Sequence, residues 1–276
     1  KGNIRGEADV RIDEATDGSG NIICPLEIDE VYGGGNEAEM YGGSNIDLGC
    51  ITSLKAIYGG AKNANVGDDI VLTITSGHFD RVFGGNNIGG TINGSITVNI
   101  EETGCHPITI GELYGCGNQA AYTAPEGKSG ATVNIKSFTS IGRVFGGGLG
   151  ATATVTGNTT VNINEVLGEH ANTAYAGANI TLDGTTVALP PHTLNKIGAI
   201  GTVFGGGNLA KVIGNPTVNV GTESTVTFVS LVDDSSTASV DERVKNVVGV
   251  DIRDNIYGGG NFAEVEGDPK VNIGKE

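Results

Sequence analysis

Carboxylates are the side chains of this chain whose placement could support hydrolysis or elimination. Asp80 and Asp254 stand three residues, and Glu112 two residues, before an aromatic residue that opens a run of glycines. Acids on neighbouring strands of one face would shift each other's pKa and so divide a general acid from a base. The Asp80 position, however, changes from one copy of this phrase to the next, as Asp29, Lys55, Asp80, Gly111 and Gly142. The lysine favours an ion ladder, so we expect no catalytic residue, and Asp80, Glu112 and Asp254 remain the acids of an enzyme alternative.

Metal and nucleophile chemistry have weaker support. The four histidines, at positions 78, 106, 170 and 192, show neither metal-ligand spacing nor a nearby serine or cysteine motif. We therefore expect turn or loop histidines and no metal site. Residues 13–21, DEATDGSGN, place oxygen ligands beside glycines as a calcium loop does, but they lack the final glutamate of an EF-hand. Calcium is thus the one cofactor that the sequence leaves open.

The cysteines offer two candidate disulfides. Cys24 and Cys50 each precede an aromatic–glycine phrase by eight residues, which predicts equivalent positions on adjacent repeats. A disulfide or a stack of reduced thiols fits that placement. Cys105 precedes Tyr114 by nine residues and Cys116 replaces a glycine, so a second pair would close the loop between them. We predict Cys24–Cys50 and Cys105–Cys116 as candidate pairs.

The elements that must position these residues come from an internal repeat. An aromatic residue opens a glycine run at seven places, with steps of 26, 25, 31, 31, 59 and 53 residues: Tyr32, Tyr58, Phe83, Tyr114, Phe145, Phe204 and Tyr257. The two long steps are about twice the short ones. We place a degenerate copy around Tyr175 in the first and an insertion at about residues 221–253 in the second.

Each copy also ends in a phrase of the type Thr-Val-Asn-Ile. Its apolar residues alternate, as in Val98 and Ile100 or Val133 and Ile135, which predicts a strand with one buried face and a solvent-facing residue between. Three short strands per copy, separated by glycine corners, indicate repeats stacked about 4.8 Å apart as a parallel β-solenoid. We expect one all-β domain over residues 1–276, with about eight coils of 25–31 residues.

Composition limits the partners. With 16 basic and 32 acidic side chains the net charge is −16, which opposes binding to nucleic acid or an anionic membrane. The sequence contains no run of about 18 apolar residues, so it predicts no membrane-spanning helix. The chain begins and ends within a repeat, so we expect it to be part of a longer repeat protein.

These copies resemble a known class of protein. The V-F/Y-G-G-G-N and T-V-N-I phrases are similar to the repeats of right-handed parallel β-helices of the pectin-lyase-like class. They particularly resemble repetitive surface-exposed proteins of gut Bacteroidetes and adhesin-type passenger domains. The resemblance implies export to the bacterial cell surface and contact with glycans or host surfaces, and it transfers no catalytic residue.

Three columns of equivalent residues could carry function. The seven aromatics either form an outward ribbon that binds a polysaccharide or stack on one another as structural filler. The asparagines that follow the glycines are expected to hydrogen-bond along the stack, with a ligand site as the alternative: Asn36, Asn87, Asn118, Asn179, Asn208 and Asn261. Arg81, Glu112 and Arg143 form a charged column expected to fix register.

We therefore expect a non-enzymatic exported or cell-surface module for adhesion or glycan binding, whose partner is a polysaccharide or a host or cell-surface protein. The alternatives are a carbohydrate-active enzyme, either a polysaccharide lyase or a glycoside hydrolase, and a structural spacer. Because solenoids often carry function in insertions, residues 221–253 are a further place for partner contact.

Overall fold

The structure, a computed structural model, describes residues 2–17, 19, 21–103, 106–166, 175–192, 198–222 and 248–274. These residues form strands, turns and loops and no helix. Consequently the described residues contain no helix long and apolar enough to cross a membrane. The all-β class predicted from the alternating phrases is confirmed.

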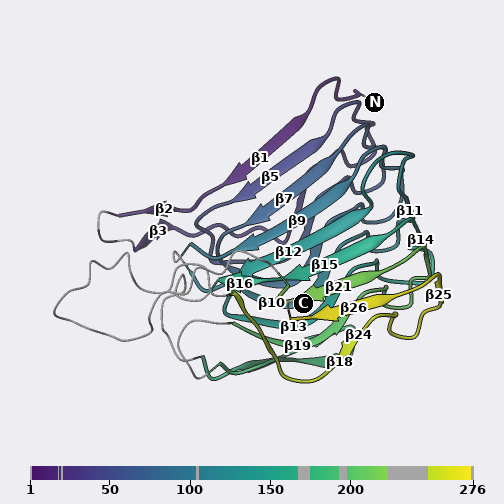
Figure 1. Cartoon of the computed structure of the whole chain (residues 1–276). Coiled ribbons are helices and arrows are strands. Elements are labelled where there is room, and N and C mark those ends of the chain that lie inside the picture. The colour runs from purple at the N-terminus through teal and green to yellow at the C-terminus, as the bar shows by residue number, and fades with distance from the viewer. Residues whose placement is uncertain are drawn as a thin grey trace, which may run out of the picture.

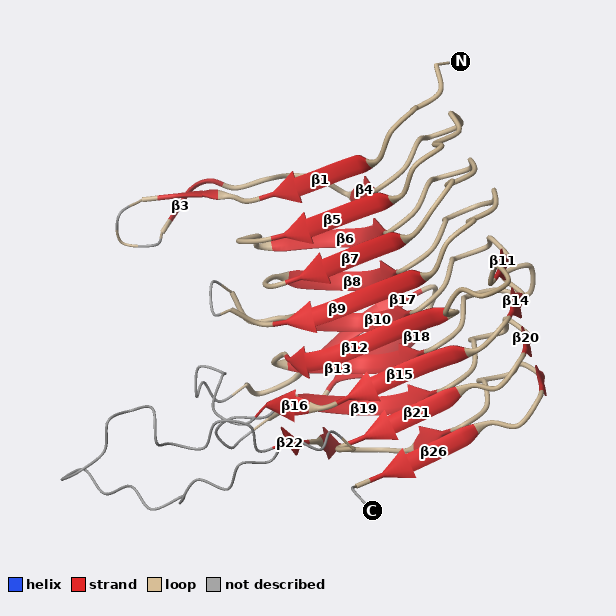
Figure 2. Cartoon of the chain, turned by 45° about the horizontal axis from the view of Figure 1, so that its top comes forward, coloured by secondary structure: helices blue, strands red, loops and turns tan. Residues whose placement is uncertain are grey.

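Two large sheets stack the repeats (Figures 1 and 2). The front sheet is parallel throughout and has the order β1 (Ala8–Ile12), β5 (Ser44–Leu48), β7 (Ile70–Ile74), β9 (Ile96–Glu101), β12 (Ala131–Ser137), β15 (Thr159–Ile163), β21 (Thr217–Val220), β26 (Lys270–Ile273). The back sheet runs β4 (Glu30–Tyr32), β6 (Ser53–Tyr58), β8 (His78–Phe83), β10 (Thr109–Tyr114), β13 (Ser140–Phe145), β19 (Ala199–Phe204), after which β23 (Asp251–Ile252) and β24 (Ile256–Tyr257) both pair with β19. The chain alternates between the two sheets, so each repeat pairs with the repeats before and after it.

A smaller side sheet joins the large ones at one edge. It is parallel and contains β11 (Tyr122–Thr123), β14 (Val155–Thr156), β20 (Val212–Ile213) and β25 (Val265–Glu266). We call one repeat's set of strands a rung and name it by its aromatic residue. A complete rung thus gives one segment to each of three faces.

The predicted register is confirmed in the front sheet. Val133 pairs with Val98 on one side and Val161 on the other, and these three side chains are fully buried. Asn134, between the apolar positions, is half-buried and aligns with the asparagines of both neighbouring strands. Like residues recur in columns because each strand's neighbours are its own copies.

The glycine runs allow the rungs to approach closely. A Cβ on Gly84 would lie 2.4 Å from the carbonyl oxygen of Gly115, and a Cβ on Gly115 would lie 2.4 Å from that of Gly146. No side chain fits at such distances, so glycine is required where the chain leaves the back sheet.

The prediction of a degenerate repeat around Tyr175 is wrong. β17 (Ala178–Leu182) and β18 (Thr185–Leu189) form an antiparallel hairpin instead. Its two turn residues, Asp183 and Gly184, have φ of 50° and 76°, as a type I′ turn requires. The Phe145 rung therefore pairs directly with the Phe204 rung. The front sheet still has eight strands because β1 supplies one.

The hairpin packs on the outer face of the back sheet at two glycines. A Cβ on Gly111 would lie 2.2 Å from Ile180 Cδ1, and one on Gly142 would lie 2.5 Å from Val187 Cγ1. On the preceding rungs this position is charged, as in Lys55 and Asp80. At Gly111 and Gly142 it is glycine because the hairpin occupies the space of a side chain.

Two shorter antiparallel pairs complete the described strands. β2 (Ala15–Thr16) pairs with β3 (Ile22–Cys24), and β16 (Glu165–Val166) pairs with β22 (Val248–Gly249). Most of the predicted insertion at 221–253 lies outside the described residues.

Candidate functional site

The predicted charged column forms a buried cluster beside the hairpin. The carboxylate of Glu112 accepts a hydrogen bond of 2.9 Å from Arg81 Nε and another from Arg143 Nη2. Only 1% of the Glu112 side chain is exposed, against 20% and 23% for the two arginines. Strand register aligns Glu112 with both arginines, one rung to either side. The pairing of opposite charges on adjacent rungs that we expected in this column is therefore present.

The hairpin adds a second acid to this cluster. Asp183, in the turn, lies 2.5 Å from Arg81 Nη2. Burial by itself lowers the pKa of Arg81, but hydrogen bonds to Asp183 and Glu112 outweigh it and raise that pKa. Arg81 thus joins the hairpin to the back sheet.

A cleft of about 320 Å³ opens between this cluster and the loops that follow the glycine runs. Its walls include Arg143 and the hairpin residues Leu182 and Thr185, and on the other side Asn208, Leu209 and Phe262. Charged, amide and apolar groups therefore converge on one hollow, as binding sites commonly require.

Leu209 and Phe262 hold an unusual backbone conformation in this cleft. Their φ angles are 62° and 51°, and their exposed fractions are 51% and 86%. The equivalent residue of the preceding rung is Gly150, with φ of 93°. A left-handed conformation costs a bulky residue about 1–2 kcal/mol, and such strain concentrates at functional sites. Two large side chains are thus held exposed in a conformation that glycine adopts more readily.

Asparagines fix the floor of these loops. Asn261 Nδ2 donates to Asn208 Oδ1 at 3.1 Å, and Asn208 Nδ2 donates to the Tyr114 hydroxyl at 3.1 Å. Asn118 likewise donates to Asn87, which donates to the Tyr32 hydroxyl. These members hydrogen-bond along the stack as predicted, whereas Asn179 is in the hairpin and outside the column. Asn36 stays with the column, since its carbonyl accepts from the Asn63 amide.

The seven predicted ligand-binding aromatics stack in one unbroken column. Ring centroids are 4.8–4.9 Å apart and the ring planes lie within 14° of parallel: Tyr32, Tyr58, Phe83, Tyr114, Phe145, Phe204 and Tyr257. The five inner residues are buried in a cluster separate from the main core, and Leu149 packs against it. Tyr32 is half-buried and Tyr257 is 46% exposed. The rings thus stack on one another, and the faces of the five inner rings are not open to a flat ligand.

The three acids of the enzyme alternative do not share a groove. Glu112 is neutralised by two arginines, and Asp80 lies 3.4 Å from His78 Nε2. Asp254 lies four rungs beyond Asp80. Its backbone amide donates to the Gly201 carbonyl of the preceding rung. At the stacking distance of the rings, four rungs place Asp254 roughly 19 Å from Asp80. Lys55 pairs with Asp29 at 2.7 Å, as the ion ladder predicts.

Neither predicted cysteine pair forms. Cys24 is an exposed free thiol and Cys116 a buried free thiol. Cys50 is bonded in a disulfide, and Cys105 lies outside the described residues. Cys24 is the last residue of β3 in the short β2–β3 hairpin, where it pairs with Ala15.

The residues considered for calcium and other metals make local contacts. Asp17 accepts hydrogen bonds from the amides of Ser19 and Asn21, and Asp13 accepts from Arg11 and from the Cys50 amide. Among the histidines, His78 contacts Thr109 and His170 lies outside the described residues. Within the described ranges, no group of three or more His, Cys, Asp or Glu residues could hold a metal ion.

No family model matches the chain, and neither a curated protein nor a solved structure matches it.

Sequence reasoning missed Asp183, Leu209 and Phe262. For Asp183 the signal was the Asp-Gly pair within ITLDGTTVAL, a type I′ turn between two apolar runs. For Leu209 and Phe262 it was disagreement among copies: the residue after the asparagine position reads Glu37, Asn63, Ile88, Gln119, Gly150, Leu209 and Phe262.

Proposed function

We propose that the chain is a right-handed parallel β-helix, exported to a bacterial cell surface, that binds a glycan in the cleft beside the hairpin. The parallel front, back and side sheets support the helix, and the resemblance of the repeats supports its hand and location. The observation that carries the binding proposal is the pair of exposed, left-handed residues Leu209 and Phe262.

The chemistry of the cleft fits a sugar. An exposed phenyl ring and a leucine offer a surface for the C–H face of a pyranose. Side-chain amides of Asn208 and Asn261 and the Thr185 hydroxyl line the same hollow and can meet sugar hydroxyls, since both groups donate and accept. Arg81 and Arg143 are balanced in this cleft by Glu112 and Asp183, so the cleft fits a neutral sugar.

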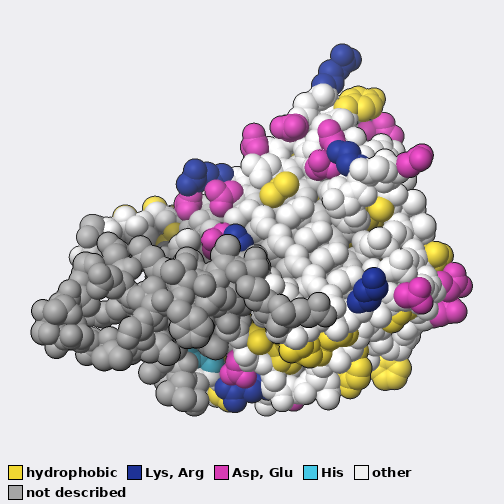
Figure 3. All heavy atoms as spheres, viewed as in Figure 1, with side chains coloured by type: hydrophobic (Ala, Val, Ile, Leu, Met, Phe, Trp, Pro, Cys, Tyr) yellow, Lys and Arg dark blue, Asp and Glu magenta, His cyan; other side chains and the backbone are white. Residues whose placement is uncertain are grey.

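The face over the front sheet, away from the cleft, would also suit a long neutral ligand. The face over the front sheet shows mostly uncharged polar side chains and backbone, with the acidic and basic groups toward its margins (Figure 3). Asn99, Asn134 and Asn162 lie along this face and are linked by amide hydrogen bonds of 2.9–3.0 Å.

The binding proposal is tested with Leu209→Gly and Phe262→Gly on a glycan array that includes neutral and acidic polysaccharide fragments. Both changes relieve the left-handed strain, so each variant is expected to unfold at the same or a higher temperature than the unmodified chain. Binding is expected to fall at least tenfold. Loss of binding together with gained stability separates a ligand contact from a structural role.

The matched control is Ile88→Gly, at the same loop position of another rung and 51% exposed but outside the cleft. It should leave glycan binding unchanged. An equal loss of glycan binding in all three variants would refute binding in this cleft. If the unmodified chain binds no glycan, the result favours the spacer alternative.

A reducing-sugar assay with the same polysaccharides addresses the enzyme alternative. The separation of Asp80 from Asp254 and the neutralised Glu112 lead us to expect no product. Release that is lost in Asp80→Asn or Glu112→Gln would overturn the binding-only proposal.

A further inference from the structure

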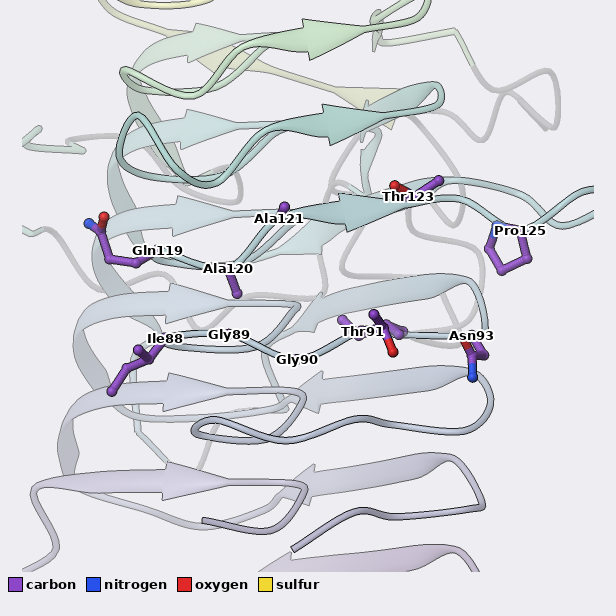
Figure 4. A pocket seen from close by; sticks show the side chains of 11 residues that line it. Ile88, Gly89, Gly90, Thr91, Asn93, Gln119, Ala120, Ala121, Thr123 and Pro125 are labelled. Carbon is purple, nitrogen blue, oxygen red and sulfur yellow. The ribbon is translucent and has the colours of Figure 1, made fainter. Parts of the chain in front are cut away.

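A second pocket, of about 590 Å³, lies between the loops of the Phe83 and Tyr114 rungs. Residues 88–93 form one wall and residues 119–125 the other, and Figure 4 shows the two segments spread apart around it. Small residues line it, among them Gly89, Gly90, Ala120 and Ala121. This pocket is distinct from the glycan cleft, and its role does not rest on that proposal.

The pocket arises from a change in rung length. From Phe83 to Ile96, the first residue of β9, the chain advances 96 − 83 = 13 residues. From Tyr114 to its partner position Ala131 it advances 131 − 114 = 17 residues. The four extra residues carry the second loop outward from the first.

Side-face pairing is interrupted at this point. Met40, Val66 and Ile92 pair in sequence as isolated parallel bridges, and Tyr122 starts the side sheet by pairing with Val155. In the described part of the chain no bridge joins Ile92 to Tyr122. Two strand edges therefore face each other across the pocket.

The facing edges carry unused backbone groups. The Thr91 carbonyl and the Asn93 amide bond to Val66, so the amide and carbonyl of Ile92 point toward the pocket. On the other edge the amides of Tyr122 and Ala124 bond to the next rung, which turns the Thr123 amide toward the pocket. No backbone hydrogen bond within the described ranges takes up these groups of Ile92 and Thr123.

Contacts at the floor and ends of the pocket limit its extent. The buried Tyr122 hydroxyl donates to the Gly94 carbonyl at 2.9 Å behind the pocket. At one end the Gln119 amide donates to the Asn87 carbonyl. At the other, Lys128 Nζ lies 2.9 Å from Asp69 of the Tyr58 rung, which accepts a hydrogen bond from the Ser95 amide. The opening is thus a slot of fixed length between two paired regions.

We infer that this slot binds an extended peptide, which inserts as a strand and completes the side sheet between Ile92 and Thr123. Main-chain hydrogen bonds provide affinity in such strand addition, and side-chain pockets provide selectivity. The buried Ile92 lines the inner side of the slot, so the inward peptide side chain must be small. The net charge of −16 favours a peptide without acidic residues.

The test uses an acetylated and amidated heptapeptide, Lys-Thr-Val-Ala-Val-Thr-Lys, and amide hydrogen exchange of the whole chain. Without peptide, the Ile92 and Thr123 amides should exchange much faster than the Val66 amide, which is hydrogen-bonded. Saturating peptide should slow both at least tenfold and leave exposed amides elsewhere unchanged. Unchanged exchange at both sites would overturn the inference, as would protection by a glycan in place of the peptide.

Thr123→Pro removes the amide that faces the slot and spares those that bond the next rung. Peptide binding is expected to weaken about three- to tenfold, the contribution of one hydrogen bond. Thr123→Val keeps the amide and should bind as the unmodified chain does. Equal affinity of a folded Thr123→Pro variant would contradict strand insertion, and if that variant does not fold, the exchange experiment decides alone.

Discussion

Phe145 stacks on Phe204 with ring centroids 4.8 Å apart and planes 3° from parallel, although 59 residues separate them. β13 and β19 pair in register around these two rings. After Phe145 the chain completes its rung with β14 and β15, forms the hairpin that packs on the outer face of the back sheet, and then enters β19 of the next rung. An excursion of this length is tolerated because loop-closure cost grows slowly with length.

Gly142→Ala tests how tightly the hairpin packs on the back sheet. The new Cβ would lie 2.5 Å from Val187 Cγ1 and 2.7 Å from the Gly111 carbonyl oxygen. We expect the free energy of unfolding in urea to fall by about 1–3 kcal/mol. Val187→Ala in the same chain should recover part of that loss, since the two sites share one contact. Strict additivity of the two changes would mean that the hairpin does not press on Gly142.

Tyr114→Phe tests the hydroxyl at the centre of the aromatic column. It leaves the ring stack intact but removes the buried acceptor of Asn208 Nδ2. We expect a loss of about 1 kcal/mol in the free energy of unfolding. Tyr257→Phe, at the exposed end of the same column, should change it by less than about 0.5 kcal/mol. Indistinguishable effects would show that the Asn208 bond adds nothing.

Asn162→Ala tests the asparagine ladder of the front sheet. Asn162 donates to Asn134 and accepts from Asn219, each at 2.9 Å. We expect a loss of about 1–2 kcal/mol, roughly two hydrogen bonds at a half-buried site. Asn272→Ala, at the exposed end of the ladder, removes the single bond to Asn219 and should cost about half as much. Calorimetric unfolding of both variants measures the difference.

Glu165→Gln tests a buried acid outside the cleft. Burial raises the pKa of Glu165 well above its usual 4.5, and hydrogen bonds from the amides of Gly198 and Asp251 offset this only in part. The folded chain therefore keeps a proton that the unfolded chain has lost. Its free energy of unfolding should fall as pH rises from about 4.5 through the folded pKa, by at most about 1.4 kcal/mol per pH unit.

The glutamine variant should remove that slope and gain stability relative to the unmodified chain above pH 5, with little difference at pH 4. The exposed Glu126→Gln is the matched control and should leave the slope as it is. A slope that persists in Glu165→Gln would assign it to another group.

The regular parts of this fold were readable because each rung repeats its neighbours' chemistry. Val98, Val133 and Val161 share a column, and alternation identified both that column and its partner Asn134. The hairpin was misjudged because Tyr175 followed by Ala-Gly-Ala imitates a repeat, and repeat matching took precedence over the turn signal at Asp183 and Gly184. The spacing of the repeats alone could not decide between a further repeat and a hairpin at this place.

The candidate sites were less accessible to prediction. Burial of Tyr58 or Phe83 depends on how the following loop folds back over the rings, which no local pattern encodes. The left-handed conformation of Leu209 and Phe262 likewise follows from tertiary packing, since Glu37 and Gln119 occupy the same position without it. The sequence does show that the repeats carry different residues at this position.

The interrupted side sheet also has a mechanical consequence. Backbone hydrogen bonds between rungs run along the stacking direction, so a pull along that direction loads successive rung interfaces in series. Between the Phe83 and Tyr114 rungs the front and back sheets carry the load without the third sheet. Within the described residues this interface lacks the side-face pairing that its neighbours have, and a strand bound in the slot would supply it.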